Sequence, residues 1–126
     1  MEGSDCAPEA VPAPTAGNNR EWMRGLLPLL VLCTLRDGPS YGYAISATLA
    51  QHGLGDVKGG TLYPLLARHE ASGYVTTQWH PGSSGPDRKY FALTRSGRVE
   101  ISRSISDWLG FARTLEEFIT SEGAWA

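Results

Sequence analysis

Apolar residues recur at helical spacing along the first part of this 126-residue chain. From position 22 onward they fall three or four residues apart and mark one face of a helix: Trp22, Leu26, Leu29, Leu30 and Cys33. The pattern stops at the Gly-Pro turn "RDGPS" (36–40). Because Pro28 has no N–H to donate, we expect the regular helix to start near Gly25 or its first turns to kink at the proline.

A second helix is predicted in "YGYAISATLAQHG" (41–53). Ser40 is placed to cap its N-terminus, and Gly53 is placed to end it. One face of this helix carries the side chains that we expect to pack inward: Tyr41, Ile45, Thr48 and Leu49.

A third, shorter helix is predicted in "GGTLYPLLARHEASG" (59–73), and Gly73 ends it. Pro64 is tolerated if it lies in the first turn, where the N–H groups lack partners in any case. Positions i, i+3, i+4 and i+7 predict one buried face: Leu62, Leu65, Leu66 and His69. A lone histidine on such a face is usually neutral and hydrogen-bonded, whereas a pH sensor or a metal ligand would need partners that are not close in sequence.

The pattern then changes from helical to extended. The segments "YVTTQWH" (74–80) and "RKYFALT" (88–94) are rich in β-branched and aromatic residues. They are joined by "PGSSGPD" (81–87), a loop of Gly, Ser and Pro, so the pair is predicted to form a β-hairpin. Thr94 ends the second strand and is placed to cap the helix that follows.

A long helix is predicted from residue 95 to about residue 121. Its apolar positions are spaced 4, 3, 4, 3 and 4 residues apart, which is a heptad seam: Ile101, Ile105, Trp108, Ala112, Leu115 and Ile119. Leu109, Phe111 and Phe118 add a second apolar flank. A small domain cannot cover this much apolar surface by itself, so we expect the seam to bind a partner helix, and these residues are the candidate dimer interface.

Together these elements predict a mainly α-helical fold with a small β-hairpin, a winged helix-turn-helix followed by a long C-terminal dimerisation helix. Residues 1–19 contain three prolines and only acidic charge, and we expect a disordered tail there. We assign 20–94 to the winged helix-turn-helix domain, 95–121 to the dimerisation helix and 122–126 to a short C-terminal tail.

The net charge of −2 hides a segregation of charge along the chain. Residues 20–98 carry nine Lys and Arg against five Asp and Glu, whereas 1–19 and 99–126 each carry three more acids than bases. A basic middle between acidic ends favours an anionic partner for the middle.

Several function classes are excluded by the absence of their motifs. The chain has no G-x-S-x-G, G-x-x-x-x-G-K or H-E-x-x-H pattern, so we expect no enzyme and no cofactor. Its two cysteines have no metal-ligand spacing and do not suggest a disulfide framework. A signal peptide and an apolar run of membrane-spanning length are also missing, so we expect a cytoplasmic protein without a membrane partner.

Candidate DNA contacts lie on three elements. A helix for the DNA major groove keeps one side for the core and exposes the other. On the third helix the exposed side carries Thr61, Tyr63 and Arg68. The alternative is that these side chains only form a solvated face. The glycines at its start allow a close approach to phosphate. At the start of the second helix, either Tyr41 or Tyr43 must pack inward, which leaves the other hydroxyl free for a phosphate.

The strand after the loop adds the last two candidates, Arg88 and Lys89. Neighbours on a strand point to opposite faces, so we expect one of these two cations at a phosphate rather than both.

Three blocks, "SYGYAISATL", "GGTLYPLLARHEASGYV" and "GPDRKYFALTRSG", resemble the signature blocks of the PadR family of bacterial transcriptional regulators. The resemblance extends from Trp22 to about Ile119, and the single C-terminal helix is similar to the compact subgroup that dimerises through this helix. His69, where the family usually has leucine, and Pro28 depart from the pattern. The resemblance implies a homodimeric repressor that binds a pseudo-palindromic operator in double-stranded DNA.

Trp108 has two interpretations on the predicted seam. It is either an apolar anchor of the dimer interface or, as the resemblance implies, a ligand-binding residue. In a multidrug-sensing member of the family, the tryptophan at the matching place in "SISDW" pairs with its dimer mate and sandwiches flat aromatic ligands. Repression would then be relieved by a planar aromatic molecule. The alternative function is a winged-helix protein-interaction module without specific DNA binding.

Overall fold

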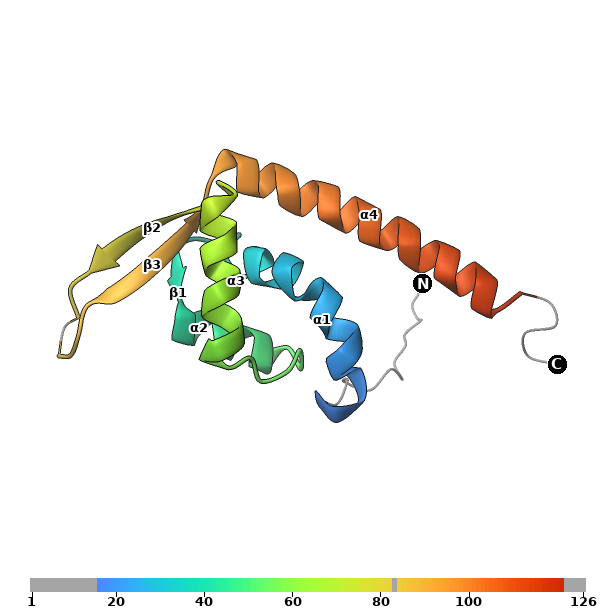
Figure 1. Cartoon of the computed structure of the whole chain (residues 1–126), viewed down its shortest axis with the longest axis horizontal. Coiled ribbons are helices and arrows are strands. Elements are labelled where there is room, and N and C mark those ends of the chain that lie inside the picture. Colours follow the sequence, from blue (N-terminus) through green and yellow to red (C-terminus); the bar gives the residue numbers. More distant parts are fainter. Residues whose placement is uncertain (1–15, 83, 122–126) are drawn as a thin grey trace, which may run out of the picture.

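A computed structural model describes residues 16–82 and 84–121 as four helices and a three-stranded sheet (Figure 1). The elements follow in the order α1 (Ala16–Cys33), β1 (Ser40–Tyr41), α2 (Gly42–Gln51), α3 (Gly59–Ala71), β2 (Val75–His80), β3 (Arg88–Leu93) and α4 (Arg95–Ile119). The predicted mainly helical fold with a hairpin and a long last helix is confirmed. Residues 1–15 of the expected N-terminal tail and the expected C-terminal tail (122–126) lie outside the described residues.

Helix α1 starts earlier than expected and continues through its proline. It begins at Ala16, four residues before the expected start of the folded part at Arg20, so 16–19 are helical and not part of a disordered tail. The helix also contains Pro28 in its interior and does not start near Gly25. The proline leaves the carbonyl of Arg24 without its usual i+4 donor.

A single apolar core joins the first three helices, the sheet and the start of α4. All of its members are less than a tenth exposed: Leu27, Val31, Leu32, Leu35, Ile45, Leu49, Leu62, Leu65, Leu66, Val75, Phe91 and Ile101. Each such side chain contributes about 1.5–3 kcal/mol when it is fully buried. The buried face predicted for α3 is confirmed in full, since Leu62, Leu65, Leu66 and His69 are all buried.

The N-terminus of α2 differs from the prediction. Ser40 does not cap this helix, because Ser40 and Tyr41 form the short strand β1 and pair with Phe91 and Tyr90. The residue that precedes the helix is Tyr41, which makes no capping hydrogen bond with its side chain. The predicted end is confirmed, since Gly53 adopts a φ of 72° just after the last turn.

The end of α3 leads directly into the hairpin. Gly73 has a φ of 81°, a left-handed conformation that suits glycine. The N–H of Tyr74 donates to the carbonyl of His69 (2.9 Å) and that of Gly73 to the carbonyl of Glu70 (3.0 Å), as in a Schellman motif. Pro64 is the sixth residue of α3 and therefore lies in its second turn, not in the first.

The sheet has the antiparallel order β1-β3-β2. The predicted hairpin is confirmed, and β1 is the additional edge strand. Thr94 then caps α4 as predicted, because its Oγ1 accepts a hydrogen bond from the N–H of Gly97 (3.0 Å). Figure 1 shows the hairpin and α4 extending from the helical core in opposite directions.

Candidate nucleic-acid interface

The N-terminal end of α3 and the tip of the hairpin lie on the same side of the molecule, away from α4 (Figure 1). The α3 side chains proposed from the sequence, Thr61, Tyr63 and Arg68, are all exposed. Thr61 and Tyr63 belong to the first half of the helix, while Arg68 is one turn from its C-terminal end. A protruding helix end beside a hairpin is the arrangement with which winged helix-turn-helix domains approach a duplex.

The Tyr63 side chain packs closely over Gly42 of α2. A Cβ at Gly42, on α2, would overlap the hydroxyl group of Tyr63, and a Cβ at Gly59 would lie 3.4 Å from its ring. The ring therefore fits over the start of α2 only because position 42 has no side chain. Tyr63 remains 52% exposed, so the same side chain packs against α2 and faces solvent.

The two tyrosines beside Gly42 have different environments. Tyr43 is 76% exposed, whereas Tyr41 is partly buried in β1. The ring of Tyr41 lies 5.3 Å from that of Tyr90, its partner across the sheet. The inward-packing member of the pair is therefore Tyr41, and Tyr43 keeps its hydroxyl accessible.

Arg88 and Lys89 point to opposite faces of the hairpin, as the strand geometry predicts. Nζ of Lys89 lies 3.9 Å from a carboxylate oxygen of Glu70 on α3, and Glu70 also accepts a hydrogen bond from Thr77 (3.0 Å). Arg88 is exposed, and its guanidinium carbon lies 4.6 Å from the centre of the Tyr41 ring. Of the two cations, Arg88 is the one directed away from α3.

Three further residues of this region were not singled out by the sequence pattern. Lys58, directly before α3, is exposed and pairs with Asp56 (2.8 Å). Trp79 is 64% exposed opposite Lys89, and the His80 ring lies 4.5 Å from Tyr90. Lys58 could have been found from the sequence, because it directly precedes the predicted recognition helix. Trp79 and His80 could not, because their neighbours depend on the register of the strands.

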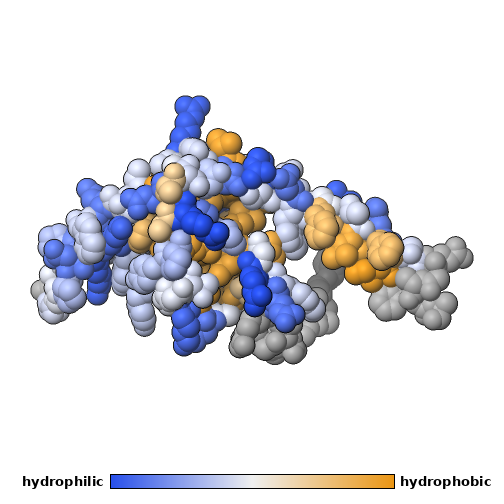
Figure 2. Space-filling view, viewed as in Figure 1, coloured by the Kyte–Doolittle hydropathy of each residue, from blue (hydrophilic) through white to orange (hydrophobic). Residues whose placement is uncertain are grey.

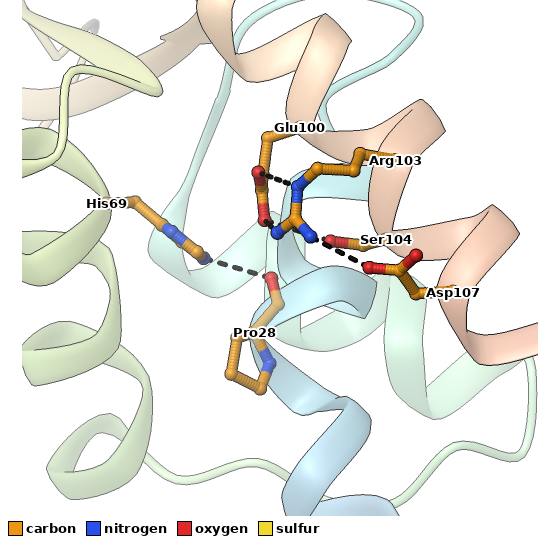
Figure 3. A network of polar contacts seen from close by, with 6 residues as sticks. All are labelled: Pro28, His69, Glu100, Arg103, Ser104 and Asp107. Carbon is orange, nitrogen blue, oxygen red and sulfur yellow. Dashed lines mark hydrogen bonds and ion pairs between the residues drawn. The ribbon is translucent and has the colours of Figure 1, made fainter. Parts of the chain in front are cut away.

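His69 joins α3 to α1 within the core. Its Nε2 donates a hydrogen bond to the carbonyl oxygen of Pro28 (2.9 Å), as Figure 3 shows. Burial lowers the pKa of the imidazole below its ordinary value, so the neutral form is favoured. The expectation of a neutral, hydrogen-bonded core histidine agrees with this geometry.

A polar network covers the start of α4 near His69 (Figure 3). Arg103 donates two hydrogen bonds to the carboxylate of Glu100 (3.0 and 2.6 Å) and one to Asp107 (2.8 Å). Ser104 donates a further bond to Glu100 (2.9 Å). The bonds from Arg103, together with the bond from Ser104, hold the pKa of Glu100 below its usual value although partial burial acts against them.

The predicted seam of α4 divides into two parts. Ile101 is 4% exposed and belongs to the core of the chain, and Ile105 packs against that core. Ala112 is partly buried, while the remaining seam residues are 42–44% exposed: Trp108, Leu115 and Ile119. With Leu109, Phe111 and Phe118 they form an apolar surface on the C-terminal half of α4 (Figure 2).

Residues 16–82 and 84–121 contain neither a metal-ligand cluster nor a membrane-spanning helix. Within these ranges no three His, Cys, Asp or Glu side chains gather where they could hold a metal ion. Among the described helices, none is both long and apolar enough to cross a bilayer.

A family model described as the transcriptional regulator PadR-like family matches residues 31–103. The chain belongs to the PadR-like family. This family consists of transcriptional regulators and not of enzymes, in agreement with the sequence-based expectation. The match includes β1, α2, α3 and the hairpin, which carry the surface described above, and also the first turns of α4.

Solved structures of PadR-like regulators share the fold. A PadR family transcriptional regulator from Eggerthella lenta is 34% identical, with a TM-score of 0.76 over 82% of this chain and 89% of that chain. A Streptococcus transcriptional regulator is 32% identical, with a TM-score of 0.67 over 78% and 96%. A transposon-encoded 37.1 kDa protein of Streptomyces fradiae is 44% identical over 78 residues, or 60% of this chain, but the match spans only 21% of that protein.

Proposed function

We propose that this PadR-like chain is a homodimeric regulator that binds specific sequences in double-stranded DNA. The observation that carries the proposal is the placement of the exposed start of α3 and the hairpin on one side of the molecule (Figure 1). The first half of α3 enters the major groove with Thr61 and Tyr63 toward the bases. Tyr43, Arg68 and Arg88 contact the phosphates on either side, and these contacts position the helix without reading sequence.

The dimer forms through α4. Its C-terminal half carries an apolar surface that a monomer leaves in water, and the seam of Trp108, Ala112, Leu115 and Ile119 has the spacing of a coiled-coil interface. In such a dimer a two-fold axis relates the two α3 helices, so each helix meets its own half-site in the same way and the two half-sites are inverted repeats. The operator is therefore pseudo-palindromic, with half-sites about one helical turn apart.

We further propose that the protein represses transcription and is released from DNA by a planar aromatic ligand at Trp108. The partly exposed indole lies on the seam, where a dimer brings two copies close together. A flat molecule between the two indole rings changes the distance between the winged helix-turn-helix domains of the two subunits. A regulator of this kind acts in the cytoplasm, where the DNA is.

The test is selection of binding sites from a random duplex library, followed by footprinting of the selected sequence. The expected footprint is symmetric, with two protected half-sites. The logarithm of the affinity should also fall linearly with the logarithm of salt concentration, with a slope of about −0.9 for each phosphate contact.

The rival function, a winged-helix protein-interaction module without specific DNA binding, predicts the opposite results. Selection would then enrich no sequence, and the main binding event would be an apolar one that salt weakens little. A library without enrichment would contradict the proposal.

A further inference from the structure

One face of the hairpin sheet carries three aromatic rings and one guanidinium. Tyr41 pairs with Tyr90 across β1 and β3, and His80 pairs with Arg88 across β2 and β3. Because β3 residues two apart share a face, and cross-strand partners share it too, the four side chains lie together. We refer to Tyr41, His80, Arg88 and Tyr90 as the wing platform.

The distances within the wing platform are those of favourable aromatic contacts. The ring centres of Tyr41 and Tyr90 are 5.3 Å apart with planes inclined at 57°, and those of His80 and Tyr90 are 4.5 Å apart with planes at 49°. The guanidinium carbon of Arg88 lies 4.6 Å from the Tyr41 ring centre, within the range of a cation–π interaction. Tyr41 thus contacts Tyr90 and Arg88, while His80 supports Tyr90.

The arrangement leaves the charge of Arg88 available. Among the residues that the structure describes, no acidic side chain forms an ion pair with Arg88, in contrast to Lys89, which pairs with Glu70. A guanidinium can stack its flat face on an aromatic ring while the N–H groups at its edge stay free to donate hydrogen bonds to a phosphate or carboxylate. Part of the rotamer freedom that an arginine loses on binding phosphate is already lost in the free protein.

We infer that Tyr41 is a positioning residue, which holds Arg88 for a DNA phosphate through the face of its ring and not through its hydroxyl. This inference rests on the proposed function and deepens it. It assigns a role to a tyrosine that packs inward, and it gives β1, a strand of only two residues, an indirect part in DNA binding. Tyr90 and His80 keep the Tyr41 ring in place from the other strands.

A double-mutant cycle tests the inference. Tyr41→Leu, which keeps apolar bulk without a π face, and Tyr41→Phe, which keeps the ring without the hydroxyl, are each made in the wild type and in Arg88→Ala. Affinity is measured by fluorescence anisotropy on one fixed duplex at one salt concentration. Thermal unfolding of every variant reports whether the sheet is intact.

Tyr41→Leu should weaken binding by about two- to five-fold, the value of one exposed cation–π contact. Tyr41→Phe should bind as the wild type does, and neither substitution should have a further effect in Arg88→Ala. Equal losses for Phe and Leu, or a loss from Leu that persists in Arg88→Ala, would overturn the inference.

Arg88→Lys provides a second test that does not depend on the stability of β1, because Arg88 is exposed. An ammonium keeps the charge but lacks the planar group, so the affinity should fall about as far as in Tyr41→Leu. Wild-type affinity of Arg88→Lys would overturn the inference while leaving DNA binding itself intact. A wild-type protein that binds no DNA would instead overturn the proposed function, and the inference with it.

Discussion

Tyr63 can take its orientation because Gly42, on another helix, has no side chain. Gly42 makes room for its hydroxyl, and Gly59 lies against its ring. From the sequence, the glycines before α3 were expected to let the backbone approach phosphate. The structure shows a further use for Gly42, which is to let the aromatic side chain of Tyr63 reach from α3 to the start of α2.

Gly42→Ala should therefore lower DNA affinity without unfolding the domain. The new methyl group meets the far end of a tyrosine side chain, which can rotate away, so the core stays intact while Tyr63 is displaced. The affinity for the selected duplex should fall as far as in Tyr63→Ala, by about 1–3 kcal/mol, and the double variant should lose no more than either single one. Anisotropy titrations measure all three, with Gly25→Ala, whose Cβ would meet nothing within 4 Å, as the control. Unchanged affinity of Tyr63→Ala would remove this side chain from the recognition surface.

His69 predicts a loss of stability in acid. Its pKa is lowered by burial, so near and below the ordinary value of about 6.5 the unfolded chain binds a proton that the folded protein does not. The free energy of unfolding should fall as the pH falls below about 6.5, until the folded-state pKa is passed. Urea unfolding from pH 8 to pH 5 measures this, and the decline should be smaller in His69→Gln. Equal slopes for the wild type and His69→Gln would contradict the prediction.

The hairpin presents two chemically different faces because consecutive strand residues point in opposite directions. One face brings Lys89 to Glu70 of α3, and the other brings Arg88 to Tyr41 of β1. The alternation was visible in the sequence and predicted that only one of the two cations would face DNA. Which one it is depends on Glu70 and Tyr41, which the fold brings to the hairpin from elsewhere in the chain.

This difference predicts unequal effects of two adjacent substitutions. Arg88→Ala should reduce the steepness of log affinity against log salt by about 0.9, the contribution of one phosphate contact. Lys89→Ala should leave the slope nearly unchanged, because its ammonium is already beside a carboxylate. Titrations at several salt concentrations on the selected duplex and on an unrelated one measure both slopes. An equal reduction in the two variants would show that Lys89 leaves Glu70 to contact DNA.

Elements with a sustained period or a distinctive composition were predicted from the sequence, and the shortest one was not. The buried face of α3 follows from its spacing, and the hairpin follows from the β-branched and aromatic composition of its strands and the Gly, Ser and Pro loop between them. β1 was missed because two residues carry no period, and Ser40 has the chemistry of a helix cap even though the sheet recruits it instead. The ambiguity between Tyr41 and Tyr43 had the same origin, since only the pairing with β3 decides which of them packs inward.

On the scale of the whole molecule, the two halves of α4 have different surroundings. Its start belongs to the core through Ile101, and its C-terminal half leaves the core with its apolar side chains exposed (Figure 2). A uniform heptad pattern therefore did not distinguish packing within the chain from packing between chains. The sequence does not reveal the point of division, because it depends on which part of α4 packs against the core of the folded chain.

Leu115→Asp should convert a dimer into a monomer. Leu115 lies on the exposed part of the seam, and a carboxylate buried in an apolar interface without a partner should raise the dissociation constant by at least about ten-fold. Sedimentation and the concentration dependence of thermal unfolding measure the change. Val99→Asp is the matched control, since Val99 is an exposed apolar residue on the opposite side of α4 and should leave the dimer intact. Dissociation by both substitutions, or by neither, would contradict dimerisation through the seam.

Trp108 distinguishes a packed interface from one that holds a ligand. If two indoles fill the interface, Trp108→Ala should destabilise the dimer by about 3–5 kcal/mol, the usual cost of truncating a large buried aromatic. If they line a space, as we propose, truncation should cost much less, and a planar aromatic cation should stack between them in the wild type. The dye should then quench tryptophan fluorescence and release the selected duplex, and both effects should weaken in Trp108→Phe. Trp79→Phe removes an exposed tryptophan from the hairpin instead and should retain both responses. Identical dye titrations of the wild type and Trp108→Phe would leave Trp108 as an apolar anchor of the dimer, with no part in sensing a ligand.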